Sequence, residues 1–452
     1  MKMGLRFIMA VFLYPFGALL GATNSFDAVQ LSYNLKTTVE AYEKVGAKSP
    51  RWDADAKQCL KAFAQLRSAS KIDESRQELQ RILPKLAAAK CDDPMIRYLH
   101  LRFVFSQNHS QQENAVAYAE VANALQKSAY PDIRKFYATY WSAAVLKTGS
   151  VATPATAKLL EQAAGYLTKA LDDRSMPTRE ATESCDLIMS FPWWTQPVRW
   201  SCYQILEPAL TNRWKGTALQ HLTKGCAYLS YAWVARGTGY ANTVNDESWK
   251  VMGARLKTAA EELEQAWQLD PKNPQICLEM MRVELGRGDE QNRLDTWFER
   301  GMKLDPASYD LCYAKLEYLR PRWYGSIEEM IDFGRACTGN TNFAGPARLM
   351  LADAHLEASR EIHDDEKRAV YWKQPNVWQD IQKAFIQFFW LYPQEVGYRH
   401  NYARYAVLCD QWQEFKDQVK LFPSTNYAYF GGIDKFKATV EHADEEIKKK
   451  SP

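Results

Sequence analysis

The sequence predicts an all-α protein built from antiparallel helical hairpins. Apolar residues recur every three or four positions along almost the whole chain, the spacing of helices with one buried face. Runs in which β-branched residues alternate with polar ones are nearly absent, so strands are not expected. Proline and glycine stand at several junctions between the periodic segments, where proline begins a helix and glycine ends one.

The N-terminal half contains seven segments with clear helical periodicity. Pro94, Pro131, Gly149 and Pro177 lie at junctions between segments. The expected helices cover residues 26–45, 53–68, 72–82, 94–105, 111–127, 132–148 and 154–171. Short turns join neighbouring helices, which favours antiparallel packing of successive pairs.

The least regular stretch follows these helices and is rich in proline and tryptophan. Residues 172–197 contain Pro177, Pro192 and Pro197, and 191–200 contain three of the 15 tryptophans. We expect a connector at 173–200 between an N-terminal half, 23–172, and a C-terminal half, 201–440, which a charged tail, 441–452, follows. We expect the tryptophans to be buried as a hinge plug, because an exposed cluster of this size promotes aggregation.

The C-terminal half contains a repeat of about 34 residues. Leu-Asp-Pro occurs at 269–271 and again at 304–306, with weaker echoes ending at Pro393 and Pro423. Small or large apolar residues precede each proline at the same offsets: Ala259, Leu263 and Ala266 in one unit, and Leu294, Phe298 and Gly301 in the next. Each unit is therefore predicted to contain a helix, a turn and a second helix, followed by a proline that prevents the second helix from continuing.

On these residues the chain resembles the tetratricopeptide-repeat superfamily. The resemblance is good over 259–336, tolerable over 381–423 and only architectural in the N-terminal half. Arg282 stands where the family usually has glycine or alanine, and 338–378 does not keep the period. The resemblance implies an α-solenoid of antiparallel helical hairpins.

A second, looser resemblance rests on the segment 319–326, Leu-Arg-Pro-Arg-Trp-Tyr-Gly-Ser, and on 402–406 and 410–412. At these segments the chain is similar to a group of bacterial exported helical-repeat proteins with a Pro-Arg-Trp-x-Gly-Ser motif. That group implies an architecture and no particular activity.

Stacked helical repeats form an extended surface that usually binds another chain. In the families that the chain resembles, the first helix of each unit lines a groove. Carrying those offsets over predicts that the groove is lined by Glu279, Val283, Arg287, Tyr318, Arg322, Tyr398, Asn401 and Tyr405. Tyrosine and arginine are favoured as interface anchors.

The first 22 residues have the order of a secretory signal peptide. Lys2 and Arg6 precede an apolar run over 7–20, and the small residues Gly21 and Ala22 follow. The run is shorter than the roughly 20 residues that span a bilayer. We expect cleavage after Ala22 and a mature chain in the periplasm or the external medium.

Export would place the nine cysteines in a compartment where disulfides persist. Cys185 and Cys202 flank the tryptophan-rich stretch, and Cys312 and Cys337 lie near opposite ends of two consecutive expected helices. These two pairs are possible disulfides, and the alternative is that all four are small buried hydrophobes.

Charge and motifs exclude several classes of function. The 57 basic and 54 acidic residues give a formal charge of +3, which provides no strong field for a nucleic acid. The sequence contains no phosphate loop, dinucleotide fingerprint, nucleophile elbow or metal-binding pattern, so no cofactor or metal is expected.

We therefore expect a non-enzymatic scaffold that binds a protein or peptide. The alternative is an enzyme that cleaves cell-wall glycan or peptide. It rests on Glu183-Ser184, a dipeptide shared with lytic transglycosylases, and Glu183 would be its carboxylic acid.

Overall fold

The computed structural model describes residues 27–107, 109–146, 153–190, 196–239, 241–288, 291–422 and 425–450. Across these segments every regular element is a helix, as predicted. The expected signal peptide, and Trp193 and Trp194 of the expected hinge plug, lie outside the described residues.

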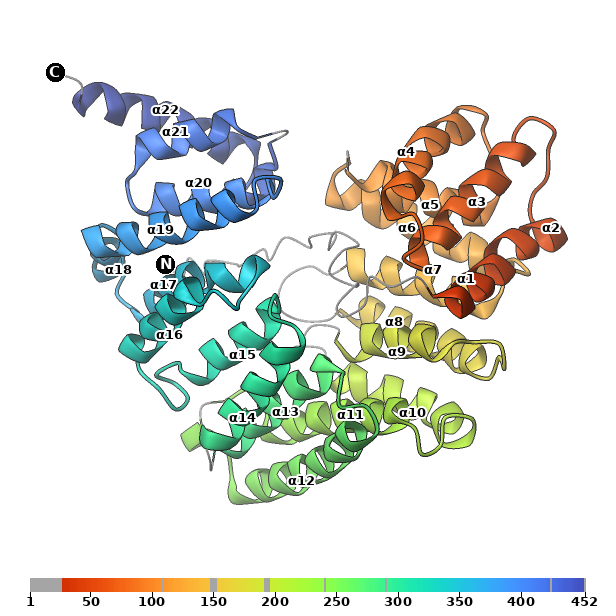
Figure 1. Ribbon diagram of the computed structural model, residues 1–452, viewed down its shortest axis with the longest axis horizontal. Coiled ribbons are helices and arrows are strands. Elements are labelled where there is room, and N and C mark those ends of the chain that lie inside the picture. Colours follow the sequence, from red (N-terminus) through yellow and green to blue (C-terminus); the bar gives the residue numbers. More distant parts are fainter. Residues whose placement is uncertain are drawn as a thin grey trace. The chain divides into compact units, whose positions relative to one another are not determined.

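The described chain divides into two compact units, which meet in sequence between Pro271 and Lys272. In each unit, successive helices run back and forth as hairpins (Figure 1). This succession is that of an α-solenoid, and we call the two parts unit 1 and unit 2.

Unit 1 contains the described residues up to Pro271. A π-helical turn, Lys36–Glu40, joins α1 and α2 into one continuous helix. The helices of unit 1 are α1 (Ala28–Leu35), α2 (Ala41–Val45), α3 (Asp53–Arg67), α4 (Ile72–Ala88), α5 (Pro94–Phe103), α6 (Gln111–Lys127), α7 (Asp132–Val145), α8 (Pro154–Leu171), α9 (Thr178–Met189), α10 (Gln196–Asn212), α11 (Ala218–Arg236) and α12 (Asp246–Leu269).

Unit 2 contains the described residues from Lys272 onward. Short 3₁₀ turns at Gly345–Leu349 and Tyr427–Phe430 precede α17 and α22. The helices of unit 2 are α13 (Pro274–Arg287), α14 (Gln291–Leu304), α15 (Tyr309–Tyr318), α16 (Ile327–Gly339), α17 (Met350–Glu361), α18 (Asp365–Trp372), α19 (Pro375–Leu391), α20 (Tyr398–Leu408), α21 (Trp412–Lys420) and α22 (Ile433–Lys450).

Helix boundaries follow the sequence where local signals are strong. Helices α6 and α8 coincide with the predicted segments, and each begins after a capping side chain, Ser110 and Thr153. Helix α4 was expected to end at residue 82 but continues through Pro84 to Ala88. Leu83 and Leu86 are fully buried, so their packing outweighs the hydrogen bond that Pro84 cannot make.

The described residues of the expected irregular connector are largely helical. Pro177 immediately precedes the first residue of α9, and Pro197 occupies the first turn of α10. Proline is well tolerated in a first helical turn because no intrahelical partner exists for its missing N–H. Pro177 and Pro197 therefore mark helix starts, and the two compact units divide after Pro271.

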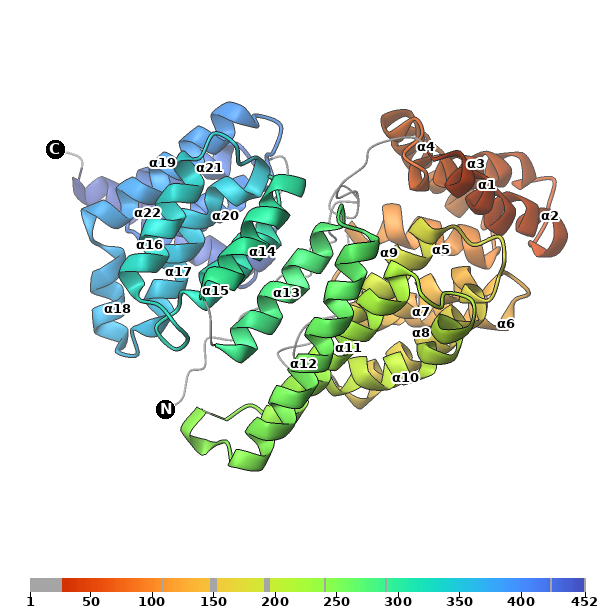
Figure 2. The same cartoon turned by 60° about the horizontal axis from the view of Figure 1, so that its bottom comes forward.

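Helices α11 and α12 explain where unit 1 ends. They lie side by side over much of their length (Figures 1 and 2). A Cβ on Gly225 of α11 would lie 2.6 Å from the Leu263 side chain, so this glycine permits the close approach. The first helix of the sequence repeat therefore packs into unit 1, while the helix that follows Pro271 begins unit 2.

The small and large residues of the repeat have the packing role that the sequence predicts. Ala259, Leu263 and Ala266 are fully buried. In unit 2, a Cβ on Gly301 would lie 2.6 Å from the Leu311 side chain. The period is lost over 338–378 because α18, an extra short helix, lies between α17 and α19.

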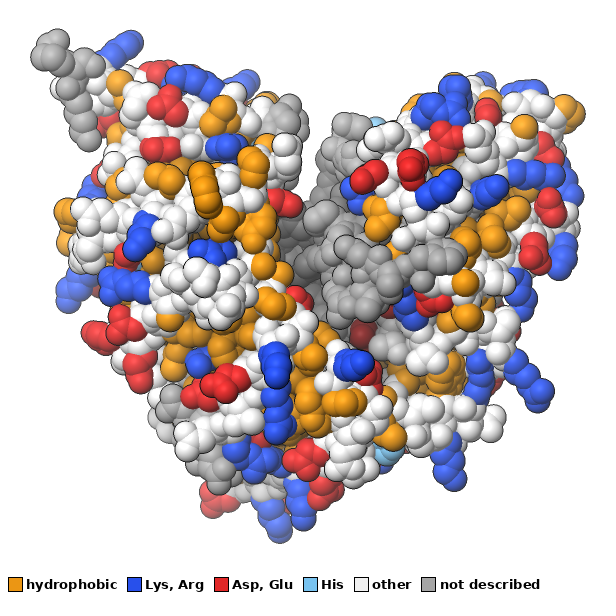
Figure 3. All heavy atoms as spheres, in the orientation of Figure 1, with side chains coloured by type: hydrophobic (Ala, Val, Ile, Leu, Met, Phe, Trp, Pro, Cys, Tyr) orange, Lys and Arg blue, Asp and Glu red, His pale blue; other side chains and the backbone are white. Residues whose placement is uncertain are grey.

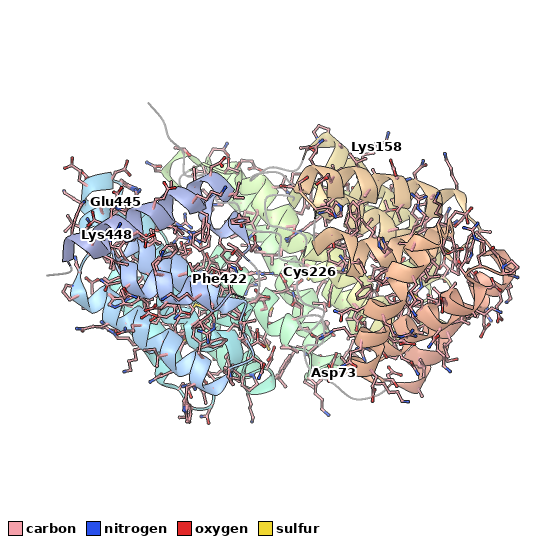
Figure 4. All side chains as sticks on the ribbon, turned by 90° about the horizontal axis from the view of Figure 1, so that it is seen from above. Asp73, Lys158, Cys226, Phe422, Glu445 and Lys448 are labelled. Atoms are coloured by element: carbon pink, nitrogen blue, oxygen red, sulfur yellow. The ribbon has the colours of Figure 1, made fainter. Side chains whose placement is uncertain are left out.

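The expected charged tail is the end of a helix. Helix α22 extends to Lys450, and Glu445 and Lys448 are exposed on it (Figure 4). Ala443 is fully buried, so this helix also closes the hydrophobic core at the end of unit 2.

Candidate binding faces of the two units

In unit 2, tyrosines and carboxylates from alternate helices meet on one face. Tyr313 of α15 donates a hydrogen bond from its hydroxyl to Glu357 Oε1 of α17 at 2.9 Å. Tyr405 of α20 donates to Asp353 Oδ1 of α17 at 3.3 Å. The Tyr309 and Tyr313 rings stack with centroids 5.7 Å apart. We call these five residues the tyrosine face.

Part of the tyrosine face remains accessible. Tyr309, Tyr313 and Asp353 are half-buried, whereas Glu357 and Tyr405 are buried. Burial, together with the nearby charge of Glu357, raises the pKa of Asp353 to about 6, although hydrogen bonds from two tyrosines oppose the shift. The surroundings of Asp353 therefore stabilise its charged form poorly. Carboxyls with a pKa shifted in this way are common at functional sites.

Arg320 holds the carboxylates beside this face. Its guanidinium lies 3.0 Å from Glu317, 2.8 Å from Glu357 and 2.8 Å from Glu361. Arg320 is 6% exposed, so this ion cluster is largely withdrawn from water. Arg322 and Arg360 also pair with Glu317 and Glu357, so three arginines compensate these three carboxylates.

The Pro-Arg-Trp-x-Gly-Ser segment forms the corner between α15 and α16. Arg322 Nη2 and Trp323 Nε1 donate to Glu317 Oε1 at 2.8 and 3.2 Å. A Cβ on Gly325 would lie 2.4 Å from the carbonyl oxygen of Leu319, which explains the glycine. Ser326 then caps α16. The motif therefore builds a turn whose arginine and tryptophan share one carboxylate.

Several residues predicted to line the groove are buried. Val283, Glu279, Tyr318 and Tyr405 are 0%, 3%, 4% and 7% exposed. Tyr318 packs against Tyr324, with ring centroids 4.7 Å apart. These four side chains contribute mainly packing and internal hydrogen bonds.

The other four predicted residues are more accessible. Arg287 pairs with Glu284 at 3.4 Å. Arg322 is exposed and bound to Glu317, while Tyr398 and Asn401 are half-buried. Arg293 of α14 also pairs with Glu284 of α13, so this carboxylate joins the two helices of one hairpin.

The repeat offsets selected a tyrosine on another side of α15. They selected Tyr318, which is buried, whereas Tyr313 contacts Glu357 of α17. The two tyrosines are five positions apart, which corresponds to about 140° around a helix, so they face different neighbours.

Unit 1 contains a different polar cluster on helices α3, α5, α7 and α9. Arg67 Nη2 lies 3.2 Å from Glu180, 2.8 Å from Glu183 and 2.9 Å from the Tyr137 hydroxyl. The same hydroxyl donates to Glu180 Oε1 at 2.8 Å. Glu180 is fully buried. We call the arginine cluster the group Arg67, Arg102, Arg134, Tyr137, Arg179, Glu180 and Glu183.

Arg134 adds a second buried cation. It is 1% exposed, and it donates to Asn34 Oδ1 at 2.9 Å and to Thr37 Oγ1 at 3.2 Å. Burial lowers the pKa of Arg134, and the charge of Glu180 opposes that shift. Burial alone would raise the pKa of Glu180, but Arg67 and Arg134 outweigh it and hold the pKa below its usual value.

Glu183, the carboxylate of the enzyme alternative, is part of this cluster. Its Oε2 lies 2.8 Å from Arg67 Nη2, and its Oε1 accepts from Arg179 Nε at 2.8 Å. Both oxygens are therefore occupied by guanidinium groups. A general acid must carry a proton on one oxygen to deliver it to a leaving group, so this geometry does not favour such a role.

Sequence reasoning did not find the arginine cluster, although the sequence contains a signal for it. Arg134 lies on a helix whose other side chains are strongly aromatic, including Phe136, Tyr137 and Trp141. An arginine flanked by residues of a buried face is a candidate for an internal partner.

Neither of the two disulfides that the sequence suggested is formed in this structure. All nine cysteines are buried free thiols. Cys185 lies near Thr223 of α11, whereas Cys202 lies near Glu161 of α8, so these two thiols face different neighbours. Cys312 and Cys337 lie near each other, and the Cys312 thiol donates to Met302 Sδ at 3.7 Å.

Trp200 is the described tryptophan of the expected hinge plug. It stacks on Tyr231 with ring centroids 4.1 Å apart and meets Tyr228 edge-on at 5.3 Å. Both tyrosines belong to α11, so Trp200 fixes α10 against that helix.

A second exposed surface lies on α19. Trp390 is 80% exposed, and Ile386, one turn earlier, is 56% exposed. Figure 3 shows hydrophobic side chains gathered over α19 and α20. A large exposed tryptophan is a frequent interface anchor.

The described residues contain neither a membrane-spanning helix nor a group of metal ligands. No described helix combines the length and apolarity needed to cross a membrane. No three His, Cys, Asp or Glu side chains of the described residues are grouped to hold a metal ion.

Comparisons with known proteins add little. No family model matches the chain, and no curated protein matches it. Among solved structures, one similar chain is the human IFIT1 dimer with m7Gppp-AAAA, at 9% identity and a TM-score of 0.29, covering 88% of this chain and 94% of that one. The assignment of the all-α helical-hairpin fold therefore rests on the chain's own helices.

Proposed function

We propose that this protein is a non-enzymatic scaffold that binds a polypeptide partner non-covalently through the tyrosine face of unit 2. The observation that carries the proposal is the accessible pair Tyr309 and Tyr313, stacked beside the half-buried Asp353. Tyrosine offers a large contact area with little loss of side-chain entropy, and its hydroxyl can bond to a peptide backbone.

Charge favours a partner with basic side chains at this face. Asp353 is costly to ionise where it lies, and Asp310 is exposed on the same helix as Tyr309. A lysine or arginine that reaches Asp353 would supply the missing counter-charge and could stack on the tyrosine rings.

We also propose that the protein works outside the cytoplasm. The order of charged, apolar and small residues over 1–22 supports export. N-terminal sequencing of protein from separated cell fractions tests this: a mature chain that begins at Thr23 in the envelope or medium is expected, and a cytoplasmic chain that retains Met1 would contradict it.

Partner capture with matched variants tests the binding proposal. The chain from Thr23 onward is immobilised under non-reducing conditions, exposed to envelope and culture extracts of its own source, and the bound proteins are identified by mass spectrometry. Tyr309→Ala with Tyr313→Ala should reduce capture at least about 10-fold, the effect expected of interface anchors. Tyr427→Ala is the control, because Tyr427 is an exposed tyrosine outside this face.

The same experiment can also show that the partner binds at a different surface. If Trp390→Ala abolishes capture and the double tyrosine variant does not, the partner binds the surface of α19. An empty capture with a bait that remains helical would contradict the scaffold proposal and redirect work to glycan binding and cell-wall cleavage.

A further inference from the structure

A small pocket lies within the arginine cluster of unit 1. It encloses about 20 Å³, and helices α3, α5, α7 and α9 line it. Its polar side chains include Arg67 and Arg102, and most of the remaining wall is aromatic, with Trp141 and Phe103 half-buried. This volume holds roughly one water-sized group, so the pocket admits the head of a ligand and not its body.

Arg102 is the unusual member of the pocket wall. It is 9% exposed, and its guanidinium lies over the Trp141 ring at 3.6 Å from the centroid. The Tyr118 hydroxyl accepts its one hydrogen bond to a described residue, at 3.5 Å. No carboxylate of the described residues pairs with it, whereas Arg67 has two. A buried cation without an anion is costly unless a ligand supplies one.

The stacking leaves Arg102 able to bind an anion. Trp141 covers the flat face of the guanidinium, while the N–H donors point outward in its plane. One of these donors is directed at Tyr118, so an edge of the fork stays available.

The surrounding charge also favours an anion. The arginine cluster contains four arginines and two glutamates, and Glu183 is bound by Arg67 and Arg179. Glu180 is bound by Arg67 as well. Arg134 forms no salt bridge with a described carboxylate either, but the charge of Glu180 acts on it. The positive charge of Arg102 is therefore the least compensated in the group.

The shape of the site selects among anions. A planar carboxylate matches the guanidinium edge with two parallel hydrogen bonds. A tetrahedral phosphate is larger and does not match this planar edge or the largely aromatic wall of the pocket. The half-exposed rings of Phe103 and Trp141 and the side chain of Leu187 offer an apolar surface at the pocket. We propose that this pocket binds a small apolar or aromatic carboxylic acid through Arg102.

Calorimetry with simple probes tests this proposal, which is independent of the tyrosine face. Benzoate is titrated into the full chain from Thr23, beside benzamide, a neutral analogue of similar shape, and inorganic phosphate. We expect benzoate to bind in the millimolar range or more tightly, as a fragment in one small pocket does, and benzamide and phosphate to bind more weakly.

Two variants locate the binding. Arg102→Gln should weaken benzoate binding at least about 10-fold, because a charge-assisted bidentate contact is lost. Arg102→Lys keeps the positive charge but loses the forked pair of donors. Its affinity for benzoate should therefore lie between those of the parent and of Arg102→Gln. Arg97→Gln, on the same helix but with an exposed side chain, is the matched control and should bind like the parent.

Stability measurements keep the result interpretable. Removing an unpaired buried charge should leave the melting temperature of Arg102→Gln unchanged or raise it. Absence of benzoate binding to the parent at millimolar concentration, equal affinity in Arg102→Gln, or tighter binding of phosphate than of benzoate would each overturn the proposal.

Discussion

The two units place polar clusters on several helices of the same kind of architecture, but with different balances of charge. The arginine cluster of unit 1 contains four arginines and two carboxylates. Beside the tyrosine face of unit 2, Arg320, Arg322 and Arg360 pair with Glu317, Glu357 and Glu361, and Asp353 adds a fourth carboxylate. The helical-hairpin fold thus fixes where such side chains meet and leaves the sign of their charge to the sequence.

The electrostatic consequences are opposite. The pKa of Glu180 in unit 1 is lowered, because Arg67 and Arg134 outweigh the effect of burial. The pKa of Asp353 in unit 2 is raised to about 6 by burial and by Glu357. These shifts accord with our proposals of an anionic ligand for unit 1 and of a partner with basic side chains for unit 2.

The largest effect is expected from Glu180→Gln. This change leaves Arg67 and Arg134 buried with much less opposite charge, which costs about 3–5 kcal/mol of unfolding free energy. Urea unfolding at neutral pH, followed by circular dichroism, measures the loss. Glu120→Gln is the control, because Glu120 is 65% exposed, and its loss should stay within about 0.5 kcal/mol. A loss below about 1 kcal/mol in Glu180→Gln would mean that the unit 1 network contributes little.

The corresponding change in unit 2, Glu357→Gln, should cost less, about 1–3 kcal/mol. Arg320 keeps Glu317 and Glu361 as partners after the change, and Arg360, which also pairs with Glu357, has a side chain that is 29% exposed to water. The same urea experiment ranks the two variants. A larger loss in Glu357→Gln than in Glu180→Gln would reverse the comparison between the units.

The pH dependence of stability should have opposite signs in the two units. Because the pKa of Asp353 is raised in the folded state, protonation of this carboxyl stabilises the folded protein relative to the unfolded chain. That stabilisation is lost as the pH rises from about 4 to about 6. Asp353→Asn should therefore be more stable than the wild type at pH 7 or above, by about 1–2 kcal/mol after discounting for partial exposure. The difference should close below a pH of about 4.

For Glu180 the sign is reversed, because its pKa is lowered. Its contribution is present above the unfolded pKa of about 4.3 and is lost as the pH falls through the folded value. Unfolding free energies of both variants and the wild type, measured from acid to neutral pH, test the pair. Parallel pH profiles for the two variants would show that the two carboxyls do not differ in this way.

The smallest effect is expected from Arg322→Gln, about 0.5 kcal/mol or less. Arg322 and Arg320 bind the same carboxylate, Glu317, but the Arg322 side chain is 52% exposed and that of Arg320 is 7% exposed. Arg320→Gln provides the comparison and should cost several-fold more. Equal losses would mean that burial does not decide the strength of these pairs.

Much of the fold could be read from local sequence signals. Ser110 and Thr153 mark helix starts because a capping side chain acts on the next few residues. Gly301 predicts a close helix contact because only its small size permits the approach. By contrast, the sequence predicted that the helix from residue 72 ends at residue 82, but it continues through Pro84 to Ala88 with Leu83 and Leu86 buried.

The candidate sites that we propose depend on helix rotation and on distant partners, which spacing along the chain does not specify. The repeat offsets selected Tyr318 and not Tyr313, whose contact is with Glu357, 44 residues away. The link from Arg67 to Glu183 spans 116 residues and has no local pattern.

By itself, the sequence determined that this protein is a succession of helical hairpins, because periodicity, caps and prolines act within a few residues of one another. The tertiary structure alone decided which side chains became partners: Arg67 with Glu180, and Arg320 with Glu357. It also left Arg102 buried beside Trp141 without a carboxylate among the described residues. Charge compensation is a property of three-dimensional neighbours, so no spacing along the chain could have revealed it.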